Sequence, residues 1–276
     1  MKVAIVTDST CDIPAELAAQ YQIEIVPNIL ILDGVSLEDG VGISRQEFYN
    51  RLPSLKSLPT TAAPAVGIYQ SVYRRLVSQG VNKILSIHAP SSLSGIMNVA
   101  RLASQAFHGL VHLIDSGQVT LGLGFQVLAA AEAAAKNLPF DAIISLVKSV
   151  QERCRVLAML DTLEFVHRSG RVSWAKARLG SLLEIKPIIE LRHGKVISLG
   201  ETRTRRKGME RLRELLYAMG DLERLAILHT NCEAEAQTFL DSLKVRLATA
   251  PLIINVTTII GAHTGPNALG FAAVTS

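Results

Sequence analysis

Short apolar runs rich in β-branched residues alternate with segments of helical periodicity along the chain, and this alternation is its most constraining feature. The apolar runs predict strands at residues 3–6, 23–32, 83–87, 110–114, 155–160, 184–190, 195–199, 225–228, 252–256 and 271–274. The helical segments are residues 14–20, 44–52, 64–78, 94–107, 118–136, 204–219 and 233–247. Such alternation predicts an α/β fold with largely parallel sheets. Because the cycle runs twice, we expect two α/β lobes, residues 1–158 and 159–276.

The segment 118–136 is rich in Ala and Leu, which predicts a helix that is buried nearly all round. Gly117, Gly122 and Gly124 lie at its start, but their spacing fits neither the dinucleotide-binding fingerprint nor a phosphate-binding P-loop. We interpret these glycines as permitting a tight strand-to-helix turn and close helix packing.

A mean hydropathy of +0.29 is high for a chain without membrane spans. The longest stretch without Asp, Glu, Lys or Arg follows Arg246, and Pro251 and Gly265-Pro266 interrupt it, so it cannot form one spanning helix. The first apolar run has four residues and is too short for a signal peptide. We therefore expect a cytoplasmic protein without stable membrane insertion.

The three cysteines, Cys11, Cys154 and Cys232, lie far apart, which is typical of reduced, buried thiols rather than of a disulfide framework. Neither they nor the seven histidines show the spacing of a metal site. The sequence therefore predicts no bound metal.

The positive charge of the chain is concentrated in one region. Residues 164–214 contain 13 Lys and Arg against 6 Asp and Glu, a net +7, whereas the remainder contains 15 against 18, a net −3. Aromatic residues are only 5% of the chain and are not interleaved with this basic region. This pattern argues against nucleic-acid binding, which uses aromatic stacking beside basic grooves.

Polar segments follow predicted strands or precede predicted helices at residues 7–10, 59–64, 90–95 and 115–117. Ligands of open parallel sheets bind beyond the carboxyl ends of the strands, where hydroxyls and helix N-termini favour an anion. For Ser9, Thr10 and Ser91 we favour helix capping. For Thr61 and Ser94, capping and anion binding both remain open.

His263 is the only titratable side chain after Arg246. It is either a hydrogen-bonded structural residue or a donor to a carboxylate. Ser94, His263 and Asp115 would supply the residue types of a hydrolase triad, but the Gly-x-Ser-x-Gly motif is absent and nothing in the sequence brings the three together. No catalytic constellation is predicted.

Several of these segments together resemble the DegV family. The matching motifs are Thr7-Asp8-Ser9-Thr10, Pro59-Thr60-Thr61, Leu93-Ser94-Gly95, Ile114-Asp115-Ser116, residues 179–188, Arg203-Thr204-Arg205 and His263-Thr264-Gly265-Pro266. They cover almost the whole chain in order. The resemblance implies a two-lobed α/β protein that binds one fatty acid and presents it to a separate fatty acid kinase. That kinase phosphorylates the carboxylate to an acyl phosphate.

The same resemblance implies roles for particular residues. Thr61 and Ser94 would hold the fatty-acid carboxylate, and His263 matches a histidine near the head group. Arg171 and Arg203 match basic positions suited to kinase docking or to the phosphoryl group. No cofactor is implied beyond the bound lipid, and we expect a monomer.

The chain departs from the family pattern at three places, which are Ala62-Ala63, Ile96-Met97 and the segment 166–169. The first two replace polar residues, which leaves fewer supporting hydrogen bonds for the head group. The third changes the surface before Arg171 and therefore affects the expected partner surface.

A bound fatty acid needs a long apolar tunnel between or beside the lobes. The uncharged stretch after Arg246 and the predicted strand at residues 29–32 are the candidate linings. Two other functions remain open: hydrolysis of acyl esters or thioesters with Ser94 as nucleophile, and lipid sensing without a kinase partner.

Overall fold

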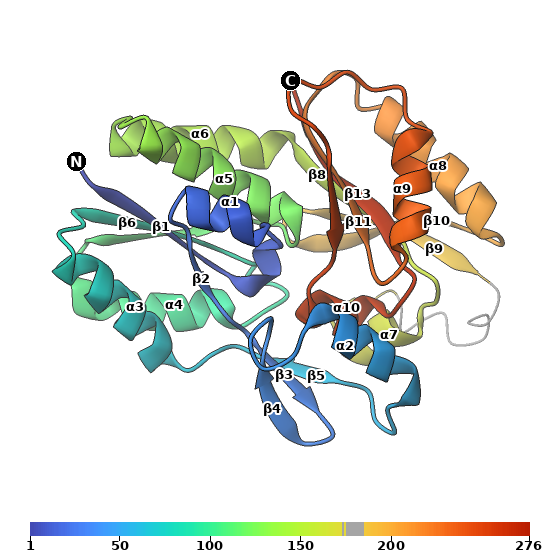
Figure 1. The fold of residues 1–276 in the computed structure, drawn as a ribbon, viewed down its shortest axis with the longest axis horizontal. Coiled ribbons are helices and arrows are strands. Elements are labelled where there is room, and N and C mark those ends of the chain that lie inside the picture. The colour runs from blue at the N-terminus through green and yellow to red at the C-terminus, as the bar shows by residue number, and fades with distance from the viewer. Residues whose placement is uncertain (173, 175–184) are drawn as a thin grey trace.

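The computed structural model describes residues 1–172, 174 and 185–276, and it confirms the α/β class (Figure 1). The first part of the chain forms β1 (Val3–Asp8), η1 (Ser9–Cys11), α1 (Ala15–Gln20), β2 (Glu24–Val26), β3 (Ile29–Leu32), β4 (Val35–Glu38), α2 (Arg45–Arg51), η2 (Leu52–Ser54), β5 (Thr60–Ala62), α3 (Val66–Ser78), β6 (Lys83–His88), α4 (Ile96–Ser104), η3 (Gln105–Phe107), β7 (Val111–Asp115), α5 (Leu121–Ala135) and α6 (Phe140–Arg153). The second part forms β8 (Cys154–Met159), α7 (Glu164–Ser169), β9 (Lys186–Arg192), β10 (Lys195–Thr202), α8 (Arg205–Tyr217), β11 (Leu222–His229), α9 (Glu233–Asp241), β12 (Leu252–Asn255), α10 (Thr258–Thr264) and β13 (Leu269–Thr275).

A four-stranded parallel sheet with the order β2-β1-β6-β7 organises the first part of the chain. Figure 1 shows α3 and α4 on one side of this sheet and α1 and α5 on the other. Alternate residues of each strand serve the two sides: Val6 packs with the α3 and α4 side chains, whereas Ile5 packs with those of α5. Because the strands are parallel, β1, β6 and β7 all end at the same edge of the sheet.

Helix α5 lies between the four-stranded sheet and a second sheet, and its side chains pack with residues of both. The prediction of a helix buried nearly all round is confirmed. The predicted roles of the glycines are confirmed as well. Gly117 has a positive φ of 61° in the turn before the helix, and a Cβ on Gly122 would lie 2.4 Å from Val156 Cγ2. The helix therefore approaches the second sheet too closely for a larger residue.

The second sheet has six strands in the order β10-β9-β8-β13-β11-β12, with α8 and α9 packed against its outer face. The expectation of a largely parallel sheet is wrong here, because only β11 and β12 pair in parallel. One cause is the tight turn at His193-Gly194, where both residues have positive φ, which joins β9 and β10 as an antiparallel hairpin. The other is β13, which enters between β8 and β11 and runs antiparallel to both.

A three-stranded antiparallel sheet, β4-β3-β5, lies below the other two in Figure 1 and packs with α2 and α10. The single strand predicted at residues 23–32 is wrong, because the chain leaves the four-stranded sheet at Pro27 and Asn28 and starts β3 in this smaller one. Proline lacks the backbone N–H that a continuous ladder needs. Strand β5 lies within the polar segment 59–64, for which the sequence predicts no strand.

The lobe boundary expected between residues 158 and 159 lies inside β8, a strand that pairs on both sides within the six-stranded sheet. The division into residues 1–158 and 159–276 stays a prediction. Residues 179–184 of the matched motif, and the start of the strand expected at 184–190, lie outside the described residues. Among the helices of the described ranges, none has both the length and the apolar character needed to cross a bilayer.

Candidate functional site: an apolar cavity with a polar end

A cavity of about 540 Å³ lies where the carboxyl ends of β1 and β6 face the six-stranded sheet. Its volume is within the range of roughly 300–1,000 Å³ that is common for small-molecule sites. The described lining residues come from strands of the six-stranded sheet, from β5, α4, α7 and α10, and from the segments after β1 and β6, so neither sheet forms the cavity alone. This position, beyond the carboxyl ends of parallel strands, is the one that the sequence predicts.

One wall of the cavity is aliphatic because strand geometry sorts the side chains of the six-stranded sheet. Val156 and Ala158 of β8 line the cavity, as does Leu160, the residue after the strand. The intervening Leu157 and Met159 pack toward α8 and α9. The wall continues through other aliphatic residues of the second sheet and α10, namely Ile189, Leu191, Val196, Leu228, Ile259, Ile260 and Leu269. Because successive side chains of a strand point to opposite faces of the sheet, one face lines the cavity and the other packs against helices.

The stretch after Arg246 contributes to this wall as predicted, through Val256, α10 and the start of β13. The expectation for residues 29–32 is wrong. Leu30 and Leu32 are buried in a separate cluster with Phe48 and Tyr49, and of this region only Asn28 lines the cavity.

Polar side chains gather at the other end of the cavity. Thr61 lies in β5, where it pairs with Leu30 of β3, and His263 lies near the end of α10. The Thr61 Oγ1 and His263 Nε2 atoms are 2.9 Å apart, a hydrogen bond between residues 202 positions apart in sequence. Because Thr61 sits in a strand, it caps no helix, and the capping alternative for it is excluded.

The environment of His263 keeps its ring neutral. Burial, together with the positive charge of nearby Arg171, lowers the pKa of His263 to about 4. A neutral imidazole donates from one nitrogen and accepts at the other. At neutral pH His263 therefore adds no charge to the cavity and orients the Thr61 hydroxyl.

Ser94 lines the same cavity from the loop that joins β6 to α4. Its backbone N–H donates to Pro90 O at 3.1 Å, and its Oγ accepts from Ile96 N at 3.3 Å. Whereas the N-cap position of α4 is Gly95, Ser94 forms a short turn with the first residue of this helix. Its hydroxyl proton is not used in that contact and is available to an acceptor in the cavity.

Arg171 is exposed at the rim of the cavity and is the only Lys, Arg, Asp or Glu among its described lining residues. It follows Gly170, which ends α7 with a φ of 71°, and its Nη1 donates to Ser169 O at 2.6 Å. Arg203 is exposed after β10 and does not belong to the described lining. The structure thus brings Thr61, Ser94, His263 and Arg171 to one cavity and leaves Arg203 apart.

The arrangement required for a hydrolase triad is not formed by the described residues. The Asp115 carboxylate accepts from Ser91 Oγ at 2.7 Å and from Gly117 N at 3.0 Å, and His263 is bonded to Thr61. Ser91 is therefore held by Asp115 and not used as a helix cap.

The expectation that Ser9 and Thr10 cap a helix is also wrong, because Asp8 is the residue that caps η1. Thr10 instead lines the cavity, as do Asn28 and Asn98, and sequence analysis assigned none of these to the site. The sequence signal for two of them is that Thr10 lies two residues after β1 and Asn28 directly before β3. Among the departures from the family pattern, Ala62, Ala63, Ile96, Val166 and Ser169 line the cavity, so the third departure reaches the cavity as well as the surface before Arg171.

Within the described ranges, no group of three or more His, Cys, Asp or Glu side chains is arranged to hold a metal ion. The three cysteines are free thiols. Burial raises the pKa of the Cys154 thiol to about 12, which makes this side chain a poor metal ligand or nucleophile at neutral pH.

Residues 2–276 match the family described as uncharacterised protein, DegV family. A DegV domain-containing protein of Listeria monocytogenes is 31% identical over 274 residues, covering 98% of this chain and 97% of its own, and one of Streptomyces coelicolor is 33% identical over 97% and 96%.

Two solved structures each cover 100% of both chains at 29% identity. One describes fatty acid binding by a DegV family protein from Thermus thermophilus and has a TM-score of 0.92; the other is DegV, a fatty acid binding protein from Bacillus subtilis, with a TM-score of 0.87. These likenesses extend over the full length of the described chain and confirm the resemblance seen in the motifs. The chain belongs to the DegV family.

Proposed function

We propose that this protein binds one long-chain fatty acid, with the acyl chain against the aliphatic wall and the carboxylate at Thr61 and Ser94. The observation that carries the proposal is the division of the cavity into an aliphatic wall and a hydroxyl-bearing end. Such a division matches a molecule with one apolar tail and one acidic head. The similar proteins of Thermus thermophilus and Bacillus subtilis are described as binding fatty acids, which supports the same ligand class.

The acyl chain supplies most of the affinity. Burying a methylene group contributes about 0.8 kcal/mol, so a chain of roughly 15 carbons contributes on the order of 10 kcal/mol. The loss of translational and conformational freedom offsets several kcal/mol of this gain. The remainder is enough for the lipid to stay bound during purification.

The head group supplies orientation. The neutral tautomer of His263 that carries its proton on Nε2 donates to Thr61 Oγ1 and leaves the Thr61 hydroxyl proton for one carboxylate oxygen. The Ser94 hydroxyl proton, which its contact with Ile96 does not use, is left for the second oxygen. Hydrogen bonds to an ionised acceptor are stronger than neutral ones. Arg171 at the rim adds a positive charge without closing the cavity.

The first test is native mass spectrometry of freshly purified protein, with solvent extraction of the bound molecule. We expect a mass excess that extracts as a fatty acid and is smaller in the Thr61→Ala/Ser94→Ala double variant, because this variant loses two hydrogen bonds to the carboxylate. Thr60→Ala is the matched control, because Thr60 is the exposed neighbour of Thr61 in β5 and does not line the cavity. A lipid-free mass that added fatty acid does not shift would exclude this function.

We further propose that the protein is a cytoplasmic, monomeric carrier that performs no catalysis and presents the carboxylate to a separate fatty acid kinase. Arg171 and Arg203 would contact the kinase or the phosphoryl group. Both are exposed, and Arg171 lies beside the head-group end, which supports this assignment. The kinase would supply ATP and phosphoryl transfer.

This part is tested with lipid-loaded protein, a bacterial fatty acid kinase and ATP. Arg171→Glu and Arg203→Glu are expected to lower acyl-phosphate formation while the extracted lipid stays at the wild-type amount. Arg74→Glu on α3 makes the same charge change at an exposed position on a different surface and is expected to leave transfer unchanged. Equal loss of bound lipid in the two test variants would contradict the separation of binding from presentation.

A further inference from the structure

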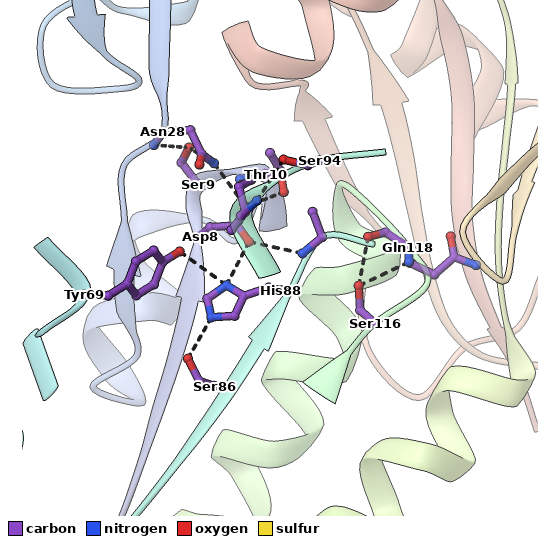
Figure 2. A network of polar contacts seen from close by, with 12 residues as sticks. Asp8, Ser9, Thr10, Asn28, Tyr69, Ser86, His88, Ser94, Ser116 and Gln118 are labelled. Atoms are coloured by element: carbon purple, nitrogen blue, oxygen red, sulfur yellow. Dashed lines mark hydrogen bonds and ion pairs between the residues drawn. The ribbon is translucent and has the colours of Figure 1, made fainter. Parts of the chain in front are cut away.

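The Asp8 carboxylate at the end of β1 is the centre of a buried hydrogen-bond network (Figure 2). Its Oδ1 accepts from Thr10 N at 3.1 Å, Thr10 Oγ1 at 2.5 Å and Asn28 Nδ2 at 3.1 Å. Its Oδ2 accepts from His88 Nδ1 at 3.0 Å and Ala89 N at 3.2 Å. Burial by itself raises the pKa of Asp8, but the contacts with His88, Thr10 and Ala89 outweigh burial and lower it below its usual value. The carboxylate is therefore ionised and fully hydrogen-bonded.

The Oδ2 atom fixes the loop that carries Ser94. Ala89 is the first residue after β6, and its N–H is held by Asp8. The next residue, Pro90, accepts from both Leu93 N at 3.0 Å and Ser94 N at 3.1 Å. Anchoring Ala89 thus sets the start of a short hydrogen-bonded turn that ends at Ser94.

The Oδ1 atom fixes the strand pair that carries Thr61. Asn28 directly precedes β3, and Leu30 of β3 pairs with Thr61 of β5. Asn28 Nδ2 donates to Asp8 Oδ1 and to Ser9 Oγ at 3.2 Å, so both of its amide protons are used within the protein. Asn28 therefore acts on the cavity through its position and donates no proton to a ligand.

The opposite side of the network leads away from the cavity. Because a carboxylate only accepts, His88 Nδ1 carries a proton, and on the other side of the ring Nε2 lies 2.7 Å from Ser86 Oγ. Ser86 in turn contacts Tyr73 OH at 2.9 Å. Neither Ser86 nor Tyr73 belongs to the described lining of the cavity, so this side stabilises the fold without bearing on the ligand.

We propose that Asp8 is a positioning residue that sets the separation of the Thr61 and Ser94 hydroxyls and thereby the recognition of a carboxylate head group. The inference rests on the proposed function, because it concerns the same site. Asp8 touches no ligand; it acts through Ala89 on one hydroxyl and through Asn28 on the other. Two donors held at a fixed separation bind the two oxygens of one carboxylate without a further cost of ordering.

The test measures head-group preference, which a merely stabilising residue would leave unchanged. Purified protein is equilibrated with equimolar hexadecanoic acid and hexadecan-1-ol, and the ratio of the two in the bound fraction is read by mass spectrometry. Asp8→Asn replaces an acceptor oxygen with an amide that faces the existing N–H donors. We expect it to lower the acid-to-alcohol ratio roughly tenfold, the equivalent of one hydrogen bond to a charged group.

Asn28→Ala removes the side-chain hydrogen bonds to Asp8 Oδ1 and Ser9 Oγ and leaves the contact of Asp8 with Ala89 in place. It is expected to lower the same ratio, so it tests the inference even if Asp8→Asn does not fold. Ser86→Ala is the control, because it weakens the far side of the network and is expected to lower the melting temperature while keeping the ratio. Wild-type ratios in folded Asp8→Asn or Asn28→Ala would overturn the inference. Wild-type protein that binds neither probe would instead contradict the proposed function.

Discussion

At the scale of single residues, the burial of His263 makes the stability of the protein depend on pH. The pKa of His263 is lowered from 6.5 to about 4 in the folded protein, mainly by burial. Between these two values the unfolded chain binds the proton and the folded chain does not, so stability falls as the pH falls through this window. The shift corresponds to up to about 3 kcal/mol.

We therefore expect that denaturant titrations between pH 6.5 and 4 show a steeper loss of unfolding free energy for wild type than for His263→Gln, which does not titrate. The difference between the two proteins is the quantity to measure, because other groups titrate as well. Burial raises the pKa of Asp12 to about 7, for example, and its contribution to stability falls as the pH rises. Parallel pH profiles of the two proteins would show that His263 is not held neutral by the fold.

The site residues show how far sequence reasoning reaches at this scale. Thr61, Ser94 and His263 were identified from family motifs, and residue chemistry alone had left Thr61 and Ser94 open between capping and anion binding. Two of them hydrogen-bond across 202 positions, a contact that no local pattern encodes. Asp8 was visible only as one residue of a polar segment, because its importance lies in five donors that come from three separate places in the chain.

At the scale of elements, the position of α5 between two sheets depends on residues without side chains. A Cβ on Gly122 would lie 2.4 Å from Val156 Cγ2. We expect Gly122→Ala to lower the free energy of unfolding by about 1–3 kcal/mol, the usual cost of overpacking, as measured by urea denaturation.

Gly67→Ala is the matched control, since Gly67 lies in α3 with nothing within 4 Å of its would-be Cβ. That substitution is expected to be neutral or to stabilise by about 0.5–1 kcal/mol, because alanine is the better helix former. Val156→Ala in the Gly122→Ala protein removes the clashing methyl and is expected to recover part of the loss. Additive effects of the two substitutions would contradict direct contact as the cause.

Elements with strong periodicity were predicted well, and those defined by distant partners were not. The buried helix α5 was expected at residues 118–136 and extends from Leu121 to Ala135. Strand β5, by contrast, is three residues long and exists through its pairing with β3. The antiparallel character of the six-stranded sheet follows from the His193-Gly194 turn and from the insertion of β13, and the sequence carries a local signal for only the first of these.

At the scale of the whole molecule, buried carboxylates connect the first part of the chain to α10. Asp39, after β4, accepts from the hydroxyls of Thr257 and Thr258, the latter at 2.7 Å, at the start of the helix that carries His263. Asp12 accepts from Thr257 N at 2.9 Å and from Arg45 at 3.0 Å. These contacts hold one end of the cavity in place from both parts of the chain.

We expect Asp39→Ala to lower the free energy of unfolding by about 2–4 kcal/mol, because it leaves two buried hydroxyls without their acceptor. Retention of bound fatty acid is expected to fall with it, since α10 also carries His263. Glu38→Ala, the adjacent and exposed carboxylate, changes the charge equally and is expected to leave both quantities unchanged. Denaturant titration and lipid extraction measure the two effects; a stable Asp39→Ala protein that retains its lipid would contradict this account.

The central place of β13 in the six-stranded sheet has a consequence for how the protein is made. Ribosomes deliver the chain from its N-terminus, and units fold as they emerge. The four-stranded sheet is complete once β7 has been synthesised, but β8 and β11 cannot be joined until Leu269–Thr275 has left the exit tunnel. A nascent chain therefore has no finished cavity until this strand has emerged from the ribosome and paired with β8 and β11.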